Sequence, residues 1–109
     1  MVKTHLIVTE QHDDYSIEWF NRLLDCKPDL SGGLLHFAIL STTGRREINT
    51  MNMKEVEKIA MKSTYPRGRG ALTVDKARIY IKEEDGGEKL LGVVTHKHIR
   101  KYAPMYDEC

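Results

Sequence analysis

The six residues Ala-Arg-Ile-Tyr-Ile-Lys, at positions 77–82, alternate between apolar side chains and polar or aromatic ones, and this pattern most limits how the chain can fold. Successive side chains of a β-strand point to opposite sides, so the segment is predicted as a strand with one buried and one exposed face. The buried face would carry Ala77, Ile79 and Ile81. The exposed face would carry Arg78, Tyr80 and Lys82.

The segments on either side predict a hairpin and a basic loop. The Asp-Gly-Gly core of residues 83–88 is typical of a tight turn, and a second apolar run follows at residues 90–95. Before the strand, Tyr-Pro-Arg-Gly-Arg-Gly at residues 65–70 combines two cations with Pro and Gly, which disfavour regular structure. We therefore expect a β-hairpin that is preceded by an irregular basic loop.

Further strands and helices are predicted in the rest of the chain. Apolar, β-branched runs and a short turn predict strands at residues 2–9, 34–41 and 45–50. Each predicted helix follows a capping residue, namely Ser16, Asn52 or Thr95. The predicted helices cover residues 16–26, 52–62 and 96–102.

The resulting order, β-α-β-β-α-β-β-α, belongs to the α+β class. Its first six elements follow the ferredoxin-like plan, an antiparallel sheet with helices on one face, here with a C-terminal extension. The length of 109 residues suits a single domain over residues 1–109, with a frayed tail from about residue 104. We also expect the strand at residues 90–95 to end the sheet, where its free edge could support a dimer.

One hydrophobic core is expected between the sheet and the helices. Its members are predicted to be Trp19, Phe20, Leu23, Phe37, Ile39, Val56, Ile59, Ile79, Ile81, Val93 and Ile99.

The composition of the chain says more about its cellular location than about its function. The formal net charge is only +1, although acids outnumber bases in residues 1–44 and bases outnumber acids in residues 45–109. No apolar run is long enough to span a membrane, and residues 1–5 do not resemble a signal peptide. The two cysteines do not make a disulfide framework. A cytoplasmic location is expected.

The most specific functional feature is a set of cations and tyrosines in the second half of the chain. Arginine beside glycine can approach a phosphate closely, and an aromatic side chain on an open sheet can stack on a base. We therefore expect a non-enzymatic protein that binds nucleic acid, RNA or single strands more readily than duplex. The expected contact residues are Arg67, Arg69, Arg78, Tyr80, Lys82, Lys97, Arg100 and Lys101, with Tyr102 beside them.

Two other functions fit the same residues. A short chain with an acidic and a basic half could be a protein–protein interaction module, for example a small phage-type inhibitor or adaptor. In addition, residues 84–99 resemble the end of a CBS module, in which a hairpin leads through Gly-Val-Val-Thr into a helix. That resemblance implies a nucleotide-binding fragment, but the family's ribose-binding acid would fall near His98 and is missing.

Catalytic and metal-binding patterns are not found in the sequence. The acidic clusters lie in predicted turns, and no residues have the spacing of a nucleophile with its base. His96 and His98 would share a side only in a strand, and this segment is predicted as helical. The sequence therefore predicts neither a catalytic site nor a metal site, and it implies no cofactor.

Overall fold

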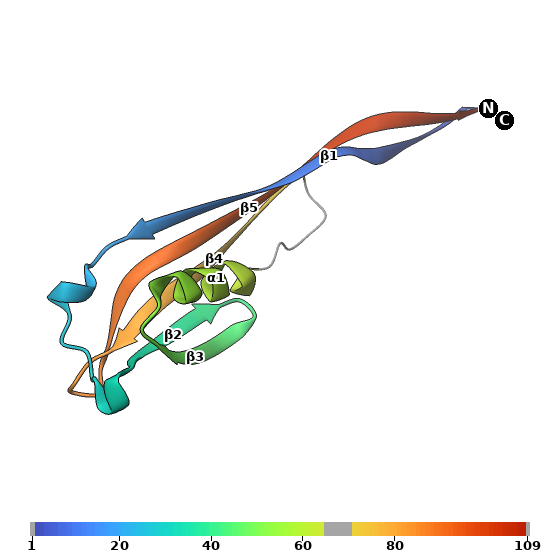
Figure 1. Cartoon of the computed structure of the whole chain (residues 1–109). Coiled ribbons are helices and arrows are strands. Elements are labelled where there is room, and N and C mark those ends of the chain that lie inside the picture. Colours follow the sequence, from blue (N-terminus) through green and yellow to red (C-terminus); the bar gives the residue numbers. More distant parts are fainter. Residues whose placement is uncertain (1, 65–70, 109) are drawn as a thin grey trace.

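The first and last strands pair with each other along almost their whole length (Figure 1). The computed structural model of the chain describes residues 2–64 and 71–108. Strand β1 (Val2–Trp19) and strand β5 (Glu88–Glu108) are antiparallel. Because this pair continues beyond the other strands, the molecule is elongated, with extents of 69, 20 and 19 Å.

The other strands complete one antiparallel sheet beside this pair. They are β2 (Leu35–Ser41), β3 (Gly44–Thr50) and β4 (Leu72–Lys82). The five strands lie in the order β1-β5-β4-β2-β3, so β5 is flanked by β1 and β4. Two short 3-10 helices, Leu23–Asp25 and Ser31–Gly33, connect β1 to β2.

Helix α1 (Met53–Ser63) lies against one face of the sheet (Figure 1). The Asn52 side chain accepts a hydrogen bond of 3.0 Å from the backbone N–H of Lys54, so Asn52 is the N-cap that the sequence predicts. Val56 and Ala60 are buried against the strands. The described helix is too short to cross a membrane.

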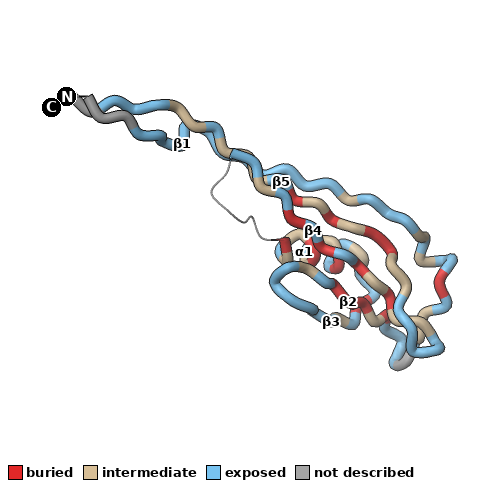
Figure 2. Tube along the Cα trace, turned by 180° about the vertical axis from the view of Figure 1, so that it is seen from behind, coloured by how far each residue is buried: buried red, intermediate tan, exposed pale blue. Residues whose placement is uncertain are grey.

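The core is the layer between α1 and the central strands, where the buried residues concentrate (Figure 2). Five predicted members are fully buried, namely Phe37, Ile39, Val56, Ile79 and Ile81. The predictions for Trp19 and Phe20 are wrong, because these side chains are 42% and 51% exposed. Leu23 and Ile59 pack at the edge of the core. On β5 the fully buried valine is Val94, while Val93 points to the other side and is half-buried, like Ile99.

The predicted helix at residues 16–26 is wrong. β1 continues to Trp19, and Ser16 lies opposite Thr95 in the ladder instead of capping a helix. The acids that were expected to end the first strand stay extended because they have basic partners on β5. Asp13 lies opposite His98, and Asp14 lies opposite Lys97.

The predicted helix at residues 96–102 is also wrong, since the whole segment belongs to β5. Its side chains alternate between the two sides of the sheet, and the pairing continues through residues 104–108, which were expected to fray. Residues 90–95 are not an edge, because they pair with β1 on one side and β4 on the other. The free edge on which the predicted dimer depended is therefore not present at residues 90–95.

The α+β class is confirmed, but the ferredoxin-like order is not. The described residues contain a single α-helix, and that helix covers one face of the sheet. The resemblance of residues 84–99 to a CBS module also fails, because no helix follows the Gly-Val-Val-Thr step. The other face of the sheet is left without a covering layer among the described residues.

Candidate nucleic-acid interface

The uncovered side of the sheet, opposite α1, is called the open face here. Strand β4 alternates between the two sides: Ala77, Ile79 and Ile81 are fully buried toward α1. The intervening side chains of Arg78, Tyr80 and Lys82 therefore lie on the open face, as the sequence predicts. Lys76 continues the same row at the start of the strand.

Three cations and one tyrosine thus form a row along β4. Neighbouring members of such a row are about 6.7 Å apart, because each is two residues from the next. Lys76, Arg78 and Lys82 form no salt bridge with any residue that the structure describes. Tyr80 lies between Ala38 on β2 and Leu90 on β5 and is half-buried.

Lys97 adds a fourth cation on the neighbouring strand. It lies opposite Val74 of β4, which belongs to the same row as Lys76. On its other side Lys97 lies opposite Asp14 of β1, although the two form no salt bridge. Glu18 also lies on β1 and on this face, opposite Val93. The open face is therefore basic along β4 and acidic along its β1 border.

One arginine of the open face is neutralised by a carboxylate. Both guanidinium nitrogens of Arg45 donate to the two oxygens of Glu88, one of them at 3.1 Å. These hydrogen bonds lower the pKa of Glu88 below its usual range. Arg45 is held by this pair, so the cations left to meet a ligand are those of β4 together with Lys97.

The other predicted contact residues do not join this row. Arg100 lies on the α1 side, where its Nε donates to Nε2 of His98 at 3.0 Å. Lys101 lies beyond β4 and forms an ion pair of 3.1 Å with Glu10. Tyr102 is half-buried in the same part of β5. Arg67 and Arg69 lie outside the described residues.

Lys76 was missed because the hydropathy pattern of β4 reverses before Ala77. Val74 is exposed and Asp75 is buried, so an analysis of hydropathy begins the strand too late, at Ala77 instead of Leu72. Burial of Asp75 is tolerated because its carboxylate accepts one shared hydrogen bond from Thr42 Oγ1, at 3.1 and 2.9 Å from the two oxygens, and another of 2.9 Å from the backbone N–H of Lys76. The positive charges at every second position, Lys76, Arg78 and Lys82, were the signal from which Lys76 could have been predicted.

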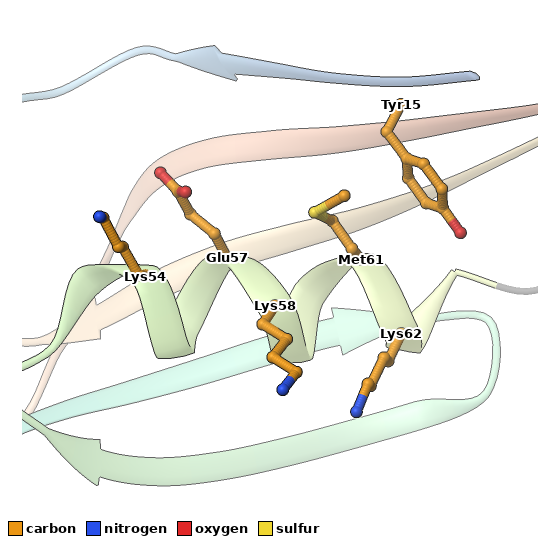
Figure 3. A pocket seen from close by; sticks show the side chains of 6 residues that line it. All are labelled: Tyr15, Lys54, Glu57, Lys58, Met61 and Lys62. Atoms are coloured by element: carbon orange, nitrogen blue, oxygen red, sulfur yellow. The ribbon is translucent and has the colours of Figure 1, made fainter. Parts of the chain in front are cut away.

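The α1 side of the sheet carries a separate pocket of about 490 Å³. Its lining comes from α1 except for Tyr15, which extends from β1 toward the C-terminal end of the helix (Figure 3). Glu57 and Met61 point to the side of α1 on which β1 and β5 are seen, whereas Lys58 and Lys62 point to the opposite side of the helix (Figure 3). The Tyr15 ring stacks on His96, with centroids 4.2 Å apart.

Next to this pocket the strand pairing brings three possible metal ligands together. One atom each of Asp13, His96 and His98 lies within 4.8 Å of the others. The sequence analysis separated the two histidines by placing them on a helix. In β5 they are two residues apart on one side of a strand.

Comparisons with known proteins identify no relative: no family model, no curated protein and no solved structure matches the chain. The function therefore has to be inferred from geometry and chemistry.

Proposed function

We propose that this protein is a non-enzymatic binding protein that holds single-stranded nucleic acid along β4. The observation that carries the proposal is the row Lys76, Arg78, Tyr80 and Lys82 on a sheet face that no helix of the described residues covers. Cations spaced along an extended strand can follow a phosphate backbone, and a tyrosine between them can stack on a base. The absence of salt bridges to these cations, within the described residues, leaves them available.

The preference for a single strand comes from the shape of this face. A duplex is read by an element that enters a groove, whereas this surface is one side of a sheet. The acidic border on β1, with Asp14 and Glu18, would repel a second strand lying parallel to the first. A ligand one strand wide fits the basic row along β4.

The double variant Arg78→Gln with Lys82→Gln tests the phosphate contacts. Labelled oligo(U) and oligo(dT) are titrated at several salt concentrations, and affinity is read from fluorescence anisotropy. Each contact with a single strand contributes about 0.7 to the slope of log K against log salt, so the slope should fall by about 1.4. At 0.1 M salt the same relation predicts roughly 25-fold weaker binding.

A matched control carries the same charge change elsewhere. Lys54→Gln with Lys58→Gln removes two exposed cations from α1, on the opposite side of the sheet. This control should keep the wild-type slope. An equal loss in both double variants would mean that net charge, and not the row on β4, governs binding, and absence of binding by the wild type would reject the proposal outright.

Tyr80→Ala tests the stacking contact separately. We expect binding to weaken by about 1–3 kcal/mol, because base stacking on an aromatic ring contributes that much. The salt slope should stay unchanged, since stacking releases no counterions. Thermal unfolding is the control: Tyr80 is on the open face, so the melting temperature should change little. A variant that binds like the wild type would show that Tyr80 makes no contact with the bases.

A different observation favours self-association as a second candidate function. Residues 2–10 of β1 and 101–108 of β5 form a two-stranded ribbon beyond the rest of the sheet, called the terminal ribbon here (Figure 2). It exposes apolar side chains on both sides: Leu6 and Val8 on one, Ile7 and Met105 on the other. An isolated two-stranded ribbon is marginally stable, and an exposed apolar surface favours contact with another molecule.

A second copy of the chain is the partner that this ribbon fits. Both long edges of the ribbon are unpaired among the described residues, so two ribbons can join edge to edge and cover each other's apolar side chains. This assembly leaves the row on β4 accessible, so the two candidate functions are compatible.

A further inference from the structure

The strongest unassigned feature is the cluster of Asp13, His96 and His98 on the α1 side of the sheet. Asp13 comes from β1 and the two histidines come from β5. Asp13 Oδ1 lies 3.1 Å from His96 Nε2 and in close contact with His98 Nδ1. These three atoms belong to neighbouring strands of one ladder, so the backbone holds them together.

The hydrogen bonds around His96 determine which of its nitrogens carries a proton. Thr64 Oγ1 donates its proton to the carbonyl oxygen of Met61 at 2.7 Å. The same oxygen lies 3.1 Å from His96 Nδ1 and is therefore left to accept a hydrogen bond from it. With the Thr64 proton on the Met61 carbonyl, the ring proton of a neutral His96 lies on Nδ1, and Nε2 presents a lone pair.

This lone pair has no partner of its own. The His96 side chain is only 3% exposed, and its Nε2 atom is buried with no hydrogen bond to any residue that the structure describes. Asp13 Oδ1 lies 3.1 Å away: it would pair with a protonated His96, but toward the lone pair of the neutral ring it is a second acceptor. A buried polar atom of this kind is costly unless a cation lies between the two groups.

We propose that Asp13, His96 and His98 bind a divalent transition-metal ion, with Zn²⁺ as the best fit. Two imidazole nitrogens and one carboxylate oxygen are a ligand set that Zn²⁺ takes in proteins. In a tetrahedral site the ligand atoms lie about 3.3 Å apart, given metal–ligand distances of about 2.0–2.2 Å. The separation of 3.1 Å between Asp13 Oδ1 and His96 Nε2 is close to that value, whereas the closer contact between Asp13 Oδ1 and His98 Nδ1 has to lengthen when the metal binds.

The surroundings provide the outer contacts that metal-binding histidines need. The hydrogen bond between Thr64 Oγ1 and Nδ1 of His96 fixes the orientation of the imidazole, and the Tyr15 ring stacks on the imidazole. Asp13 is half-exposed, so the fourth coordination position can hold water or a small ligand from solvent. The site is therefore a three-ligand site with one open position.

Arg100 opposes metal binding in its present position. Its Nε donates to His98 Nε2, which places the ring proton on Nδ1, the atom that faces Asp13. Nδ1 of His98 can bind a metal only after this proton has moved to Nε2 or been lost. A proton on Nε2 would face the N–H of Arg100, so the Arg100 side chain then has to move away. Arg100→Met should consequently bind the metal more tightly than the wild type does.

The test is a titration of the untagged, chelator-treated protein with Zn²⁺ by calorimetry and with Co²⁺ by visible absorption. We expect one ion per chain, the intense visible bands of four-coordinate Co²⁺, and a higher melting temperature with Zn²⁺. Asp13→Ala and His98→Gln should each weaken binding by at least about 100-fold. Thr64→Val should weaken it by about 10- to 100-fold, as expected for a residue that orients a ligand.

His12→Gln is the matched control, because His12 is an exposed histidine on the other side of β1, next to Asp13 in sequence. It should bind Zn²⁺ as the wild type does. Circular dichroism of each variant checks that the sheet is retained, and Asp13→Ala, at an exposed position, keeps the test valid if His98→Gln fails to fold. Wild-type binding weaker than about 100 μM, or equal binding by Asp13→Ala, overturns the proposal.

Discussion

Phe37→Ala should destabilise the protein by about 3–5 kcal/mol, because truncating a fully buried aromatic side chain leaves a cavity that the core cannot fill. Phe37 lies on β2 opposite Ile48 and Ile81, on the side that faces α1. The free energy of unfolding, measured by urea titration and circular dichroism, gives the loss directly.

Leu40→Ala is the matched control for this prediction. Leu40 belongs to the same strand but lies on the open face and is 38% exposed, so its truncation should cost about 1 kcal/mol or less. A loss below about 1 kcal/mol for Phe37→Ala would contradict the burial of this side of β2 in the core beneath α1.

The second large effect concerns the terminal ribbon. Leu6→Lys combined with Val8→Lys should convert a self-associated protein into a monomer, which sedimentation velocity at a series of concentrations would detect. Burial of one such side chain contributes about 1.5–3 kcal/mol, and a symmetric pair contains two copies of each. We therefore expect the dissociation constant to rise by at least about 100-fold.

Two exposed leucines outside the ribbon provide the comparison. Leu24 and Leu30 are 91% and 57% exposed, and their replacement by Lys makes the same chemical change between β1 and β2. That variant should associate as the wild type does. If the wild type stays monomeric at high concentration, or if both variants dissociate equally, the ribbon is not the contact surface.

The elements that sequence reasoning predicted correctly are those whose signals are local. The Asn52 cap and the apolar stripe with Val56 are sufficient for α1, because a helix is stabilised within its own segment. Strand β2 and the exposed row of β4 follow from apolar runs and alternation. For the open face, the sequence predicted Arg78, Tyr80 and Lys82 as neighbours, and the structure places them together.

The elements that were missed depend on contacts between distant parts of the chain. Residues 96–102 fit a capped helix, yet they also alternate between the two sides of a strand. The choice is made by β1, whose Asp13 and Glu10 pair with His98 and Lys101 more than 80 residues away. The same error separated His96 from His98, so the Asp13 cluster could not be predicted until β5 was known to be a strand.

The position of β5 also determines when the protein can fold during synthesis. β1 is made before the other described strands, but its ladder partner is β5, which is made after them. Until β5 leaves the ribosome, β1 has no partner and Ile79 and Ala77 on β4 lack their neighbour. Contacts that join residues so far apart in sequence form slowly, so the nascent chain should remain open and depend on chaperones until β5 has emerged.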